Sequence, residues 1–256
     1  MPSGIDHLVI AVADPNAAAA ELTEVLGLAF TAGGRHAGLG TFNRIAFLGD
    51  AYLELMGVDD RDAAKGWPIG VAAVRALGRG GGFATWAIAD TFIGVTVGQL
   101  QANGSQIGPL VHGGRQRPDG ERVEWWSAFP PELGPGRPPF LIKHLEAGAE
   151  WGAQAMAARR AFVHPIGGPV RLLGIQLAAA DPLDYAATCF DHVGLEFQSI
   201  GPAAVAAVGR QTIQVVAGPS AEVSLSVRLG IGGWTVPARS ATELGIEFIM
   251  TTASAV

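Results

Sequence analysis

The sequence predicts an α+β fold built from a repeated β-α-β-β-β unit. The first observation is a frame that occurs twice, at residues 14–27 and 181–194. Each copy opens on Asp-Pro and closes on Gly, with the same spacing (27 − 14 and 194 − 181, both 13). The second observation is that each copy follows an apolar run, at residues 8–13 and 172–180. A repeat of this length indicates a duplicated structural unit.

The first unit is expected at about residues 1–60. Residues 5–12 are rich in large and β-branched apolar side chains, which favour a strand. Asp14 suits the N-cap of a helix and Pro15 its first turn, and Gly27 is typical of a helix end. Three further strands are expected, the last two joined by a tight turn at Gly49-Asp50. Their ranges are 30–33, 41–48 and 51–58.

The second unit is expected at about residues 82–147, after a run of three glycines. A strand at 83–89 leads to a helix capped by Asp90, which ends near Asn103-Gly104. Three strands would follow, at residues 107–111, 121–129 and 139–144. A linker is expected at 148–169, and a third, degenerate unit at 170–256. That unit would contain strands at 212–216, 223–229 and, as an extra strand, 245–252.

Composition limits the class of protein. The chain has 256 residues, 49% hydrophobic and 16% charged, which is typical of a compact globular protein. Its formal net charge of −6 argues against nucleic acid or an anionic membrane as partner. No apolar run is long enough to span a bilayer, and no secretory signal is visible. A single cysteine, Cys189, excludes an internal disulfide and fits a reducing compartment, so a cytoplasmic protein is expected.

Several segments resemble the vicinal oxygen chelate superfamily, and more closely its glyoxalase-like domain branch. The resemblance rests on the opening Ile5-Asp6-His7-Leu8-Val9 and the closing Tyr52-Leu53-Glu54-Leu55 of the first unit. Further segments carry it: Gly33-Gly34-Arg35-His36, Gly40-Thr41-Phe42-Asn43, Arg117-Pro118-Asp119-Gly120, Trp125-Trp126 and Pro139-Phe140-Leu141-Ile142. It implies that two paired units form cup-shaped mixed or antiparallel sheets around a site. The superfamily includes lyases, isomerases, dioxygenases, fosfomycin transferases and drug-sequestering proteins.

Alternation along the strands places His7 and Glu54 on one side of the sheet. The opposite, aliphatic faces are expected to lie under the helix, so these two side chains would face the cup. The resemblance implies that both positions supply metal ligands, and His144 would complete the set. Two histidines and one carboxylate suit Fe(II), Zn(II), Mn(II) or Ni(II). Phe83 falls at the position of His7 in the second unit and would add no ligand.

Two alternatives concern this set. Without a metal, His7 and Glu54 would simply satisfy each other by a hydrogen bond. If the first unit instead faced the third, His144 would leave the site.

The third unit is not expected to hold a second metal. An offset of 167 (181 − 14) carries His7 onto Gly174 and Glu54 onto Ala221, with Glu222 on the opposite face. The unit is therefore expected to act as a structural lid or as a half-cup that forms a homodimer.

Other polar and aromatic side chains are expected to contact a substrate. Arg115 or Arg117 would pair with a substrate carboxylate or phosphate, although a solvated hairpin tip explains them equally. Trp126 would stack on a planar ligand. The full set of expected substrate contacts is His36, Asn43, Tyr52, Arg115, Arg117 and Trp126.

The sequence thus favours a divalent-metal-dependent enzyme acting on a small molecule with vicinal oxygens. The reaction would be an isomerisation, a lyase step or an oxygenation, with His7 and Glu54 catalytic and Glu54 moving a proton. One alternative is a metal-free protein that binds or sequesters an aromatic compound between Trp126, Tyr52 and Phe83. Another is a structural homologue that dimerises through its third unit and has lost catalysis.

Overall fold

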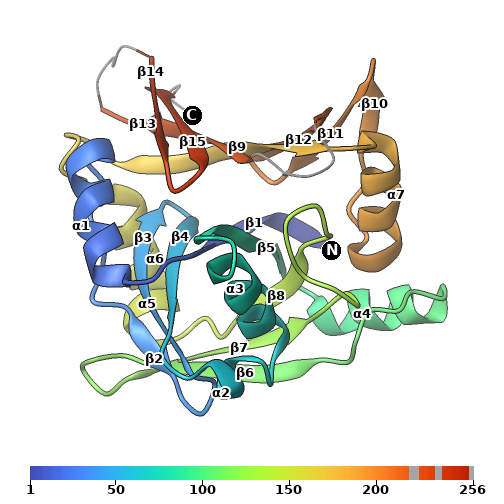
Figure 1. Cartoon of the computed structure of the whole chain (residues 1–256), viewed down its shortest axis with the longest axis horizontal. Helices are drawn as coiled ribbons and strands as arrows, with labels where there is room; N and C mark the ends of the chain where they lie inside the picture. The colour runs from blue at the N-terminus through green and yellow to red at the C-terminus, as the bar shows by residue number, and fades with distance from the viewer. Residues whose placement is uncertain (219–224, 234–237, 254–256) are drawn as a thin grey trace.

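The computed structural model describes residues 1–218, 225–233 and 238–253, and shows a closed barrel with a second sheet packed on it (Figure 1). The barrel strands are β1 (Pro2–Ala11), β2 (Gly34–His36), β3 (Thr41–Leu48), β4 (Ala51–Val58), β5 (Gly82–Asp90), β6 (Val111–Gln116), β7 (Arg122–Ala128) and β8 (Phe140–His144). Around the barrel their order is β1-β4-β3-β2-β6-β7-β8-β5. The α+β class with repeated β-α-β-β-β units is confirmed.

The helices of the repeat begin and end at the predicted caps. Helix α1 (Pro15–Leu26) starts after Asp14, whose carboxylate accepts from the backbone N–H of Asn16 at 2.8 Å. It ends at Gly27, which has a φ of +68°. Helix α7 (Pro182–Val193) has the same cap at Asp181 and a left-handed glycine after it. In contrast, α4 (Ile93–Ala102) begins after Phe92, and the expected cap Asp90 ends β5 instead.

The second sheet repeats the plan of the barrel. Its strands are β9 (Val170–Ala179), β10 (Gln198–Ile200), β11 (Ala203–Val208), β12 (Gln211–Ala217), β13 (Leu225–Ile231), β14 (Arg239–Glu243) and β15 (Ile246–Thr252), in the order β10-β11-β12-β9-β13-β15-β14. Strand β9 pairs parallel with β12 and antiparallel with β13, as β1 does with β4 and β5. This sheet therefore contains a complete third unit and part of a fourth.

Several segments differ from their predicted structure, and residues 223–224 of the strand expected at 223–229 lie outside the described residues. The strand expected at 30–33 begins only at Gly34, because Gly33 has a φ of +67°. The strand expected at 107–111 lies at β6, where Gly113 fits under the indole of Trp125. The expected linker at 148–169 contains α5 (Gly148–Trp151) and α6 (Ala153–Ala161). Two further helices, α2 (Arg61–Ala64) and α3 (Pro68–Leu77), were not expected.

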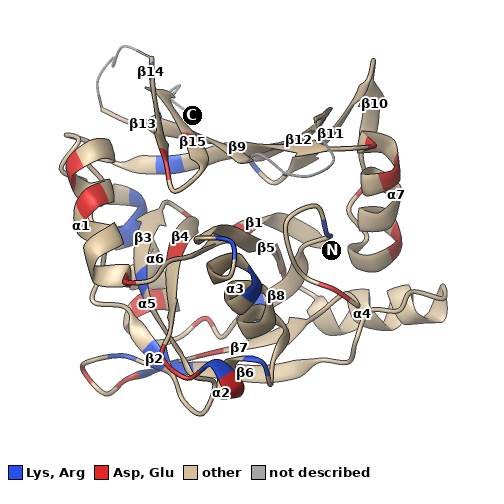
Figure 2. Cartoon of the chain, viewed as in Figure 1, with Lys and Arg blue, Asp and Glu red and all other residues tan. Residues whose placement is uncertain are grey.

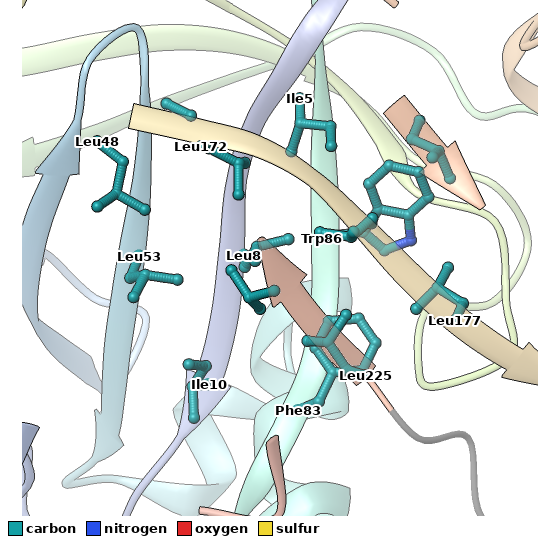
Figure 3. Packing of buried hydrophobic residues seen from close by; sticks show 14 of the residues in the cluster. Ile5, Leu8, Ile10, Leu48, Leu53, Phe83, Trp86, Leu172, Leu177 and Leu225 are labelled. Carbon is teal, nitrogen blue, oxygen red and sulfur yellow. The ribbon is translucent and has the colours of Figure 1, made fainter. Parts of the chain in front are cut away.

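The main core lies between the outer face of the barrel and the second sheet (Figure 3). Leu8, Leu53 and Trp86 of the barrel pack there with Leu177 and other apolar residues of the second sheet. Helix α1 covers part of the same core, as the aliphatic faces of β1 and β4 predict. The second sheet thus covers the outside of the barrel rather than its interior. The homodimer expected through the third unit stays a prediction.

His164 joins the segment after α6 to the first unit through two hydrogen bonds. Its Nδ1 accepts a hydrogen bond from the backbone N–H of Ala29 at 3.0 Å, and its Nε2 donates to the carbonyl of Phe47 at 2.9 Å. The residue is buried, and both partners fix one neutral tautomer. Burial lowers the pKa of His164, because a charged ring would lose solvent and the Ala29 bond.

We expect His164→Ala to lower the free energy of unfolding by about 1–3 kcal/mol, since two partly buried backbone groups lose their partners. The unfolded chain takes up a proton at a pKa of about 6.5, above that of the folded residue. The contribution of His164 is therefore complete above pH about 6.5 and falls as the pH drops below it. Urea denaturation at pH 7.5 and 5.5 measures both effects. His112→Ala, at an exposed position, is the control; an equal loss in both variants would contradict this role.

Candidate functional site inside the barrel

A break in the alternation of β1 brings Asp6 beside His7. The pairing of β1 with β5 shifts between Ile5 and His7, which is the signature of a β-bulge. The backbone of Ile5 is bonded instead by Gln211 of β12, which accepts from its N–H at 2.5 Å and donates to its carbonyl at 3.3 Å. A Cβ at Gly4 would lie 3.0 Å from the Gln211 oxygen, so glycine suits this close approach. The second sheet thereby supports the bulge that orients Asp6.

Asp6 joins two histidines at one buried point. Its Oδ1 lies 2.6 Å from His7 Nδ1 and 3.2 Å from His144 Nε2. Ligand atoms of these three residues all lie within 4.8 Å of one another. The ring of His7 stacks on Tyr52 at 4.5 Å, and that of His144 stacks on Trp151 at 3.6 Å. Stacking and hydrogen bonding together fix both imidazoles.

The charge state of this group follows from its surroundings. Burial opposes ionisation of Asp6, but the rings of His144 and His7 stabilise its anion and hold the pKa below its usual range. Burial lowers the pKa of His144. Because a carboxylate only accepts, His7 Nδ1 and His144 Nε2 carry the protons in these two bonds. The Nε2 of His7 lies on the side away from Asp6.

Glu54 lies on that other side of His7. Its Oε2 is 3.7 Å from His7 Nε2, and its Oε1 is 3.9 Å from His36 Nε2. Asn43 donates to Glu54 Oε1 at 2.5 Å and fixes the carboxylate. Burial lowers the pKa of His36, whose Nδ1 lies 2.8 Å from the hydroxyl of Thr41. Among the three expected metal ligands, His7 and His144 meet at Asp6, whereas Glu54 belongs to a second polar cluster.

The interior of the barrel is almost filled. The cavity between these clusters is about 30 Å³, enough for about one water. Trp67 before α3 and Trp151 of α5 form parts of its wall. An open cleft of about 500 Å³ lies next to it and is bounded by Asp6, His144 and Trp151. Because Trp151 and His144 border both spaces, they separate the cavity from the cleft.

Four of the six expected substrate contacts line the cavity: His36, Asn43, Tyr52 and Arg115. Trp126 does not, because the alternation of β7 turns Trp125 inward and leaves Trp126 38% exposed. Arg117 does not line the cavity either and is hydrogen-bonded to Asp119. Charges of both signs lie on β2, β6 and α2 at one end of the barrel (Figure 2). Phe83 belongs to the core outside the barrel.

Among its described residues, the second sheet does not repeat the polar clusters. Parallel pairing aligns Val9 with Glu54 and Gln176 with Gln214, so Gln214 occupies the position equivalent to Glu54. Gly174 takes the position of His7, as expected. Ala221 and Glu222, which the fixed offset selects, lie outside the described residues.

Sequence reasoning missed several residues around the cavity. Asp6 gave no local signal, because the bulge depends on pairing with β5 and on Gln211. Helix α3, which follows Trp67, could have been found from Pro68 at its first position. Its buried face shows the expected helical spacing, with Ile69, Ala72, Ala73 and Ala76.

Comparison with known proteins gives one family match. The model of the family described as glyoxalase-like domain matches residues 5–205. A hypothetical protein from Staphylococcus aureus has the same fold, with a TM-score of 0.78 and 13% identity over 97% of this chain and 99% of that one. No curated protein matches the sequence significantly. Among the described residues, no helix is long and apolar enough to cross a membrane.

Methylmalonyl-CoA epimerases are also among the similar structures. The enzyme of Streptomyces coelicolor, in complex with 2-nitronate-propionyl-CoA, matches with a TM-score of 0.42 and 16% identity over 56% of this chain and 97% of that one. The enzyme of Mycobacterium tuberculosis gives 0.41 and 19%, over 57% and 90%.

Proposed function

The chain belongs to the glyoxalase-like domain family of the vicinal oxygen chelate superfamily, and we propose that it is a divalent-metal-dependent enzyme acting on a small molecule with vicinal oxygens. The reaction class is an isomerisation, a lyase step or a dioxygenation. One observation carries the proposal: two imidazoles and a carboxylate converge on one buried point, and both imidazoles line the cavity.

Asp6, His7 and His144 fit a divalent ion. They supply one anion and, once the protons on His7 Nδ1 and His144 Nε2 are released, two ring nitrogens, a set that suits Fe(II), Zn(II), Mn(II) or Ni(II). The cleft that reaches Asp6 and His144 provides an entry path for the ion. The buried Nδ1 of His144 has no partner among the described residues, whereas its Nε2 faces Asp6. When bound, the ion would polarise a substrate oxygen and hold the adjacent one.

The remaining polar side chains of the cavity would handle the substrate and its proton. Glu54 is the base of the proposal, because Asn43 fixes one oxygen and the other faces His7 Nε2. Burial raises the pKa of Tyr52 well above its usual value, so its hydroxyl stays protonated and can donate to a substrate oxygen. The closed walls exclude water, which strengthens these interactions.

Metal analysis of protein purified without a His tag tests the proposal. We expect one equivalent of a transition metal in the wild type and its loss from His7→Ala and His144→Ala. His112→Ala removes an exposed histidine and should keep the metal. Full metal content in both site variants would show that these residues are not ligands. If the wild type bound no metal under any loading condition, a metal-dependent reaction would be excluded.

The alternative is a metal-free protein that binds or sequesters a small aromatic compound. Two observations favour it: Asp6 is satisfied by His7 and His144 without an ion, and the cavity wall includes the aromatic rings of Phe47, Tyr52, Trp67, Trp125, Phe140 and Trp151. Dialysis against a panel of aromatic compounds distinguishes the two. Saturable binding without turnover, unchanged by chelators, would support this alternative.

A further inference from the structure

A buried carboxylate from outside the barrel strands occupies one end of the cavity. Glu150 of α5 accepts from Arg115 Nη2 through Oε2 at 2.5 Å and from Arg117 Nη1 through Oε1 at 2.8 Å. The side chains of Arg115 and Glu150 are 4% and 5% exposed. Each oxygen of the carboxylate therefore has its own guanidinium donor, one of them fully inside the barrel.

The arginine side of this pair belongs to the barrel, whereas the carboxylate belongs to a short insertion. Arg115 is held by β6, but α5 has only four residues and lies between Gly148, with a φ of +71°, and Gly152. Arg115 Nη1 is also buried and has no partner among the described residues. A buried N–H group without an acceptor is unfavourable. A ligand that offers an acceptor atom to Arg115 Nη1 would therefore be stabilised.

The size of the cavity indicates that α5 must move for a ligand to enter. Ligand sites are commonly about 300–1,000 Å³, whereas this cavity is about 30 Å³. Trp151, which follows Glu150, separates it from the cleft of about 500 Å³. Withdrawal of α5 would remove Glu150 and Trp151 together and join the two spaces. The resulting pocket would be lined by Arg115 as well as by Asp6, His7 and His144.

We propose that Arg115 and Arg117 form a carboxylate-binding subsite, and that Glu150 is its internal occupant, which a substrate carboxylate displaces. The inference rests on the proposed function and deepens it, because it makes the substrate a small organic acid whose vicinal oxygens extend toward His7. Exchange of one carboxylate for another keeps the net charge of the site. The buried guanidinium is therefore never left without an anion, a state that would be strongly destabilising.

Binding of benzoate to chelator-treated protein tests the subsite independently of any metal. Glu150→Gln keeps the shape of the occupant but removes its charge. We expect it to tighten benzoate binding at least about tenfold, because an internal competitor is weakened. Benzamide, the uncharged analogue, should bind both proteins equally weakly. Quenching of the fluorescence of the cavity tryptophans (Trp67, Trp125 and Trp151) reports the binding.

The controls separate the subsite from general anion binding and from the metal proposal. In Arg115→Gln/Arg117→Gln/Glu150→Gln both donors and the occupant lose their charges, and the preference for benzoate over benzamide should disappear. Arg160→Gln changes an exposed arginine at the cleft and should have no effect. Equal benzoate affinity in wild type and Glu150→Gln, or equal binding of benzamide, would overturn the inference whether or not the protein binds metal.

A second measurement avoids dependence on the variants. Saturating benzoate should increase amide hydrogen exchange across α5 and α6 in the wild type, because the occupant is displaced. Unchanged or slower exchange there would also contradict the inference. Full metal content in the His7 and His144 variants would contradict the metal proposal but leave this result untouched, so the two proposals can fail separately.

Discussion

Asp6→Asn is expected to abolish metal binding, whereas Glu54→Gln should leave the metal in place. Asp6 is the only anion in the group that it forms with His7 and His144. Loss of a residue that merely supports a ligand costs about 10–100-fold in metal affinity, so loss of this ligand should cost more than about 100-fold. Glu54 contacts Asn43 and the far nitrogen of His7, and its amide analogue preserves that packing.

Turnover should respond in a different way from metal content. In metal-loaded Glu54→Gln we expect kcat to fall by about 10²–10⁴-fold, because the base can no longer accept a proton. Metal content of both variants, and rates for any small organic acid that the wild type converts, provide the measurements. If Glu54→Gln loses the metal and Asp6→Asn keeps it, the metal ligand is Glu54 rather than Asp6, as regular strand alternation predicts.

Local signals in the sequence predicted the repeated unit well. Asp14 and Asp181 cap their helices, and Gly27 and Gly194 end them in left-handed conformations. These interactions lie within a few residues along the chain, so their chemistry is readable without a partner strand. The duplicated frame then extends the prediction from one helix to the architecture of the barrel and the second sheet.

The polar site was only partly predictable, because it depends on contacts distant in sequence. Alternation places His7 correctly in the interior but cannot reveal the bulge that turns Asp6 beside it. That bulge is bonded by Gln211, 206 residues away. A fixed offset also fails where loops differ in length, and Gln214 rather than Ala221 therefore aligns with Glu54.

The insertion that closes the cavity shows the same limit. Glu150 and Trp151 lie in a helix too short to have a recognisable apolar period, within a segment expected to be a linker. Their roles arise from partners on β6 and β8, Arg115 and His144. Neither contact has a signature in the local sequence, so the position of α5 in the cavity wall emerges only from the fold.

Trp86→Ala is expected to cause the largest loss of stability among single substitutions in the core. Trp86 lies on β5, is 1% exposed, and packs with Leu8 and Leu177 between the barrel and the second sheet (Figure 3). Truncation of a buried tryptophan costs about 3–5 kcal/mol, through lost burial and the cavity left behind. Because domains are stable by only about 5–15 kcal/mol, this change could approach the full stability of the chain.

The same substitution at Trp126, which is 38% exposed, is the matched control and should cost less than about 1 kcal/mol. Urea denaturation followed by circular dichroism measures both variants. Since Trp86 contacts both layers, its loss should shift one cooperative transition rather than create two. A separate early transition would show instead that the second sheet unfolds independently. In that case Gln211 could leave the bulge at Asp6 while the barrel stayed folded, and the site would depend on the barrel alone.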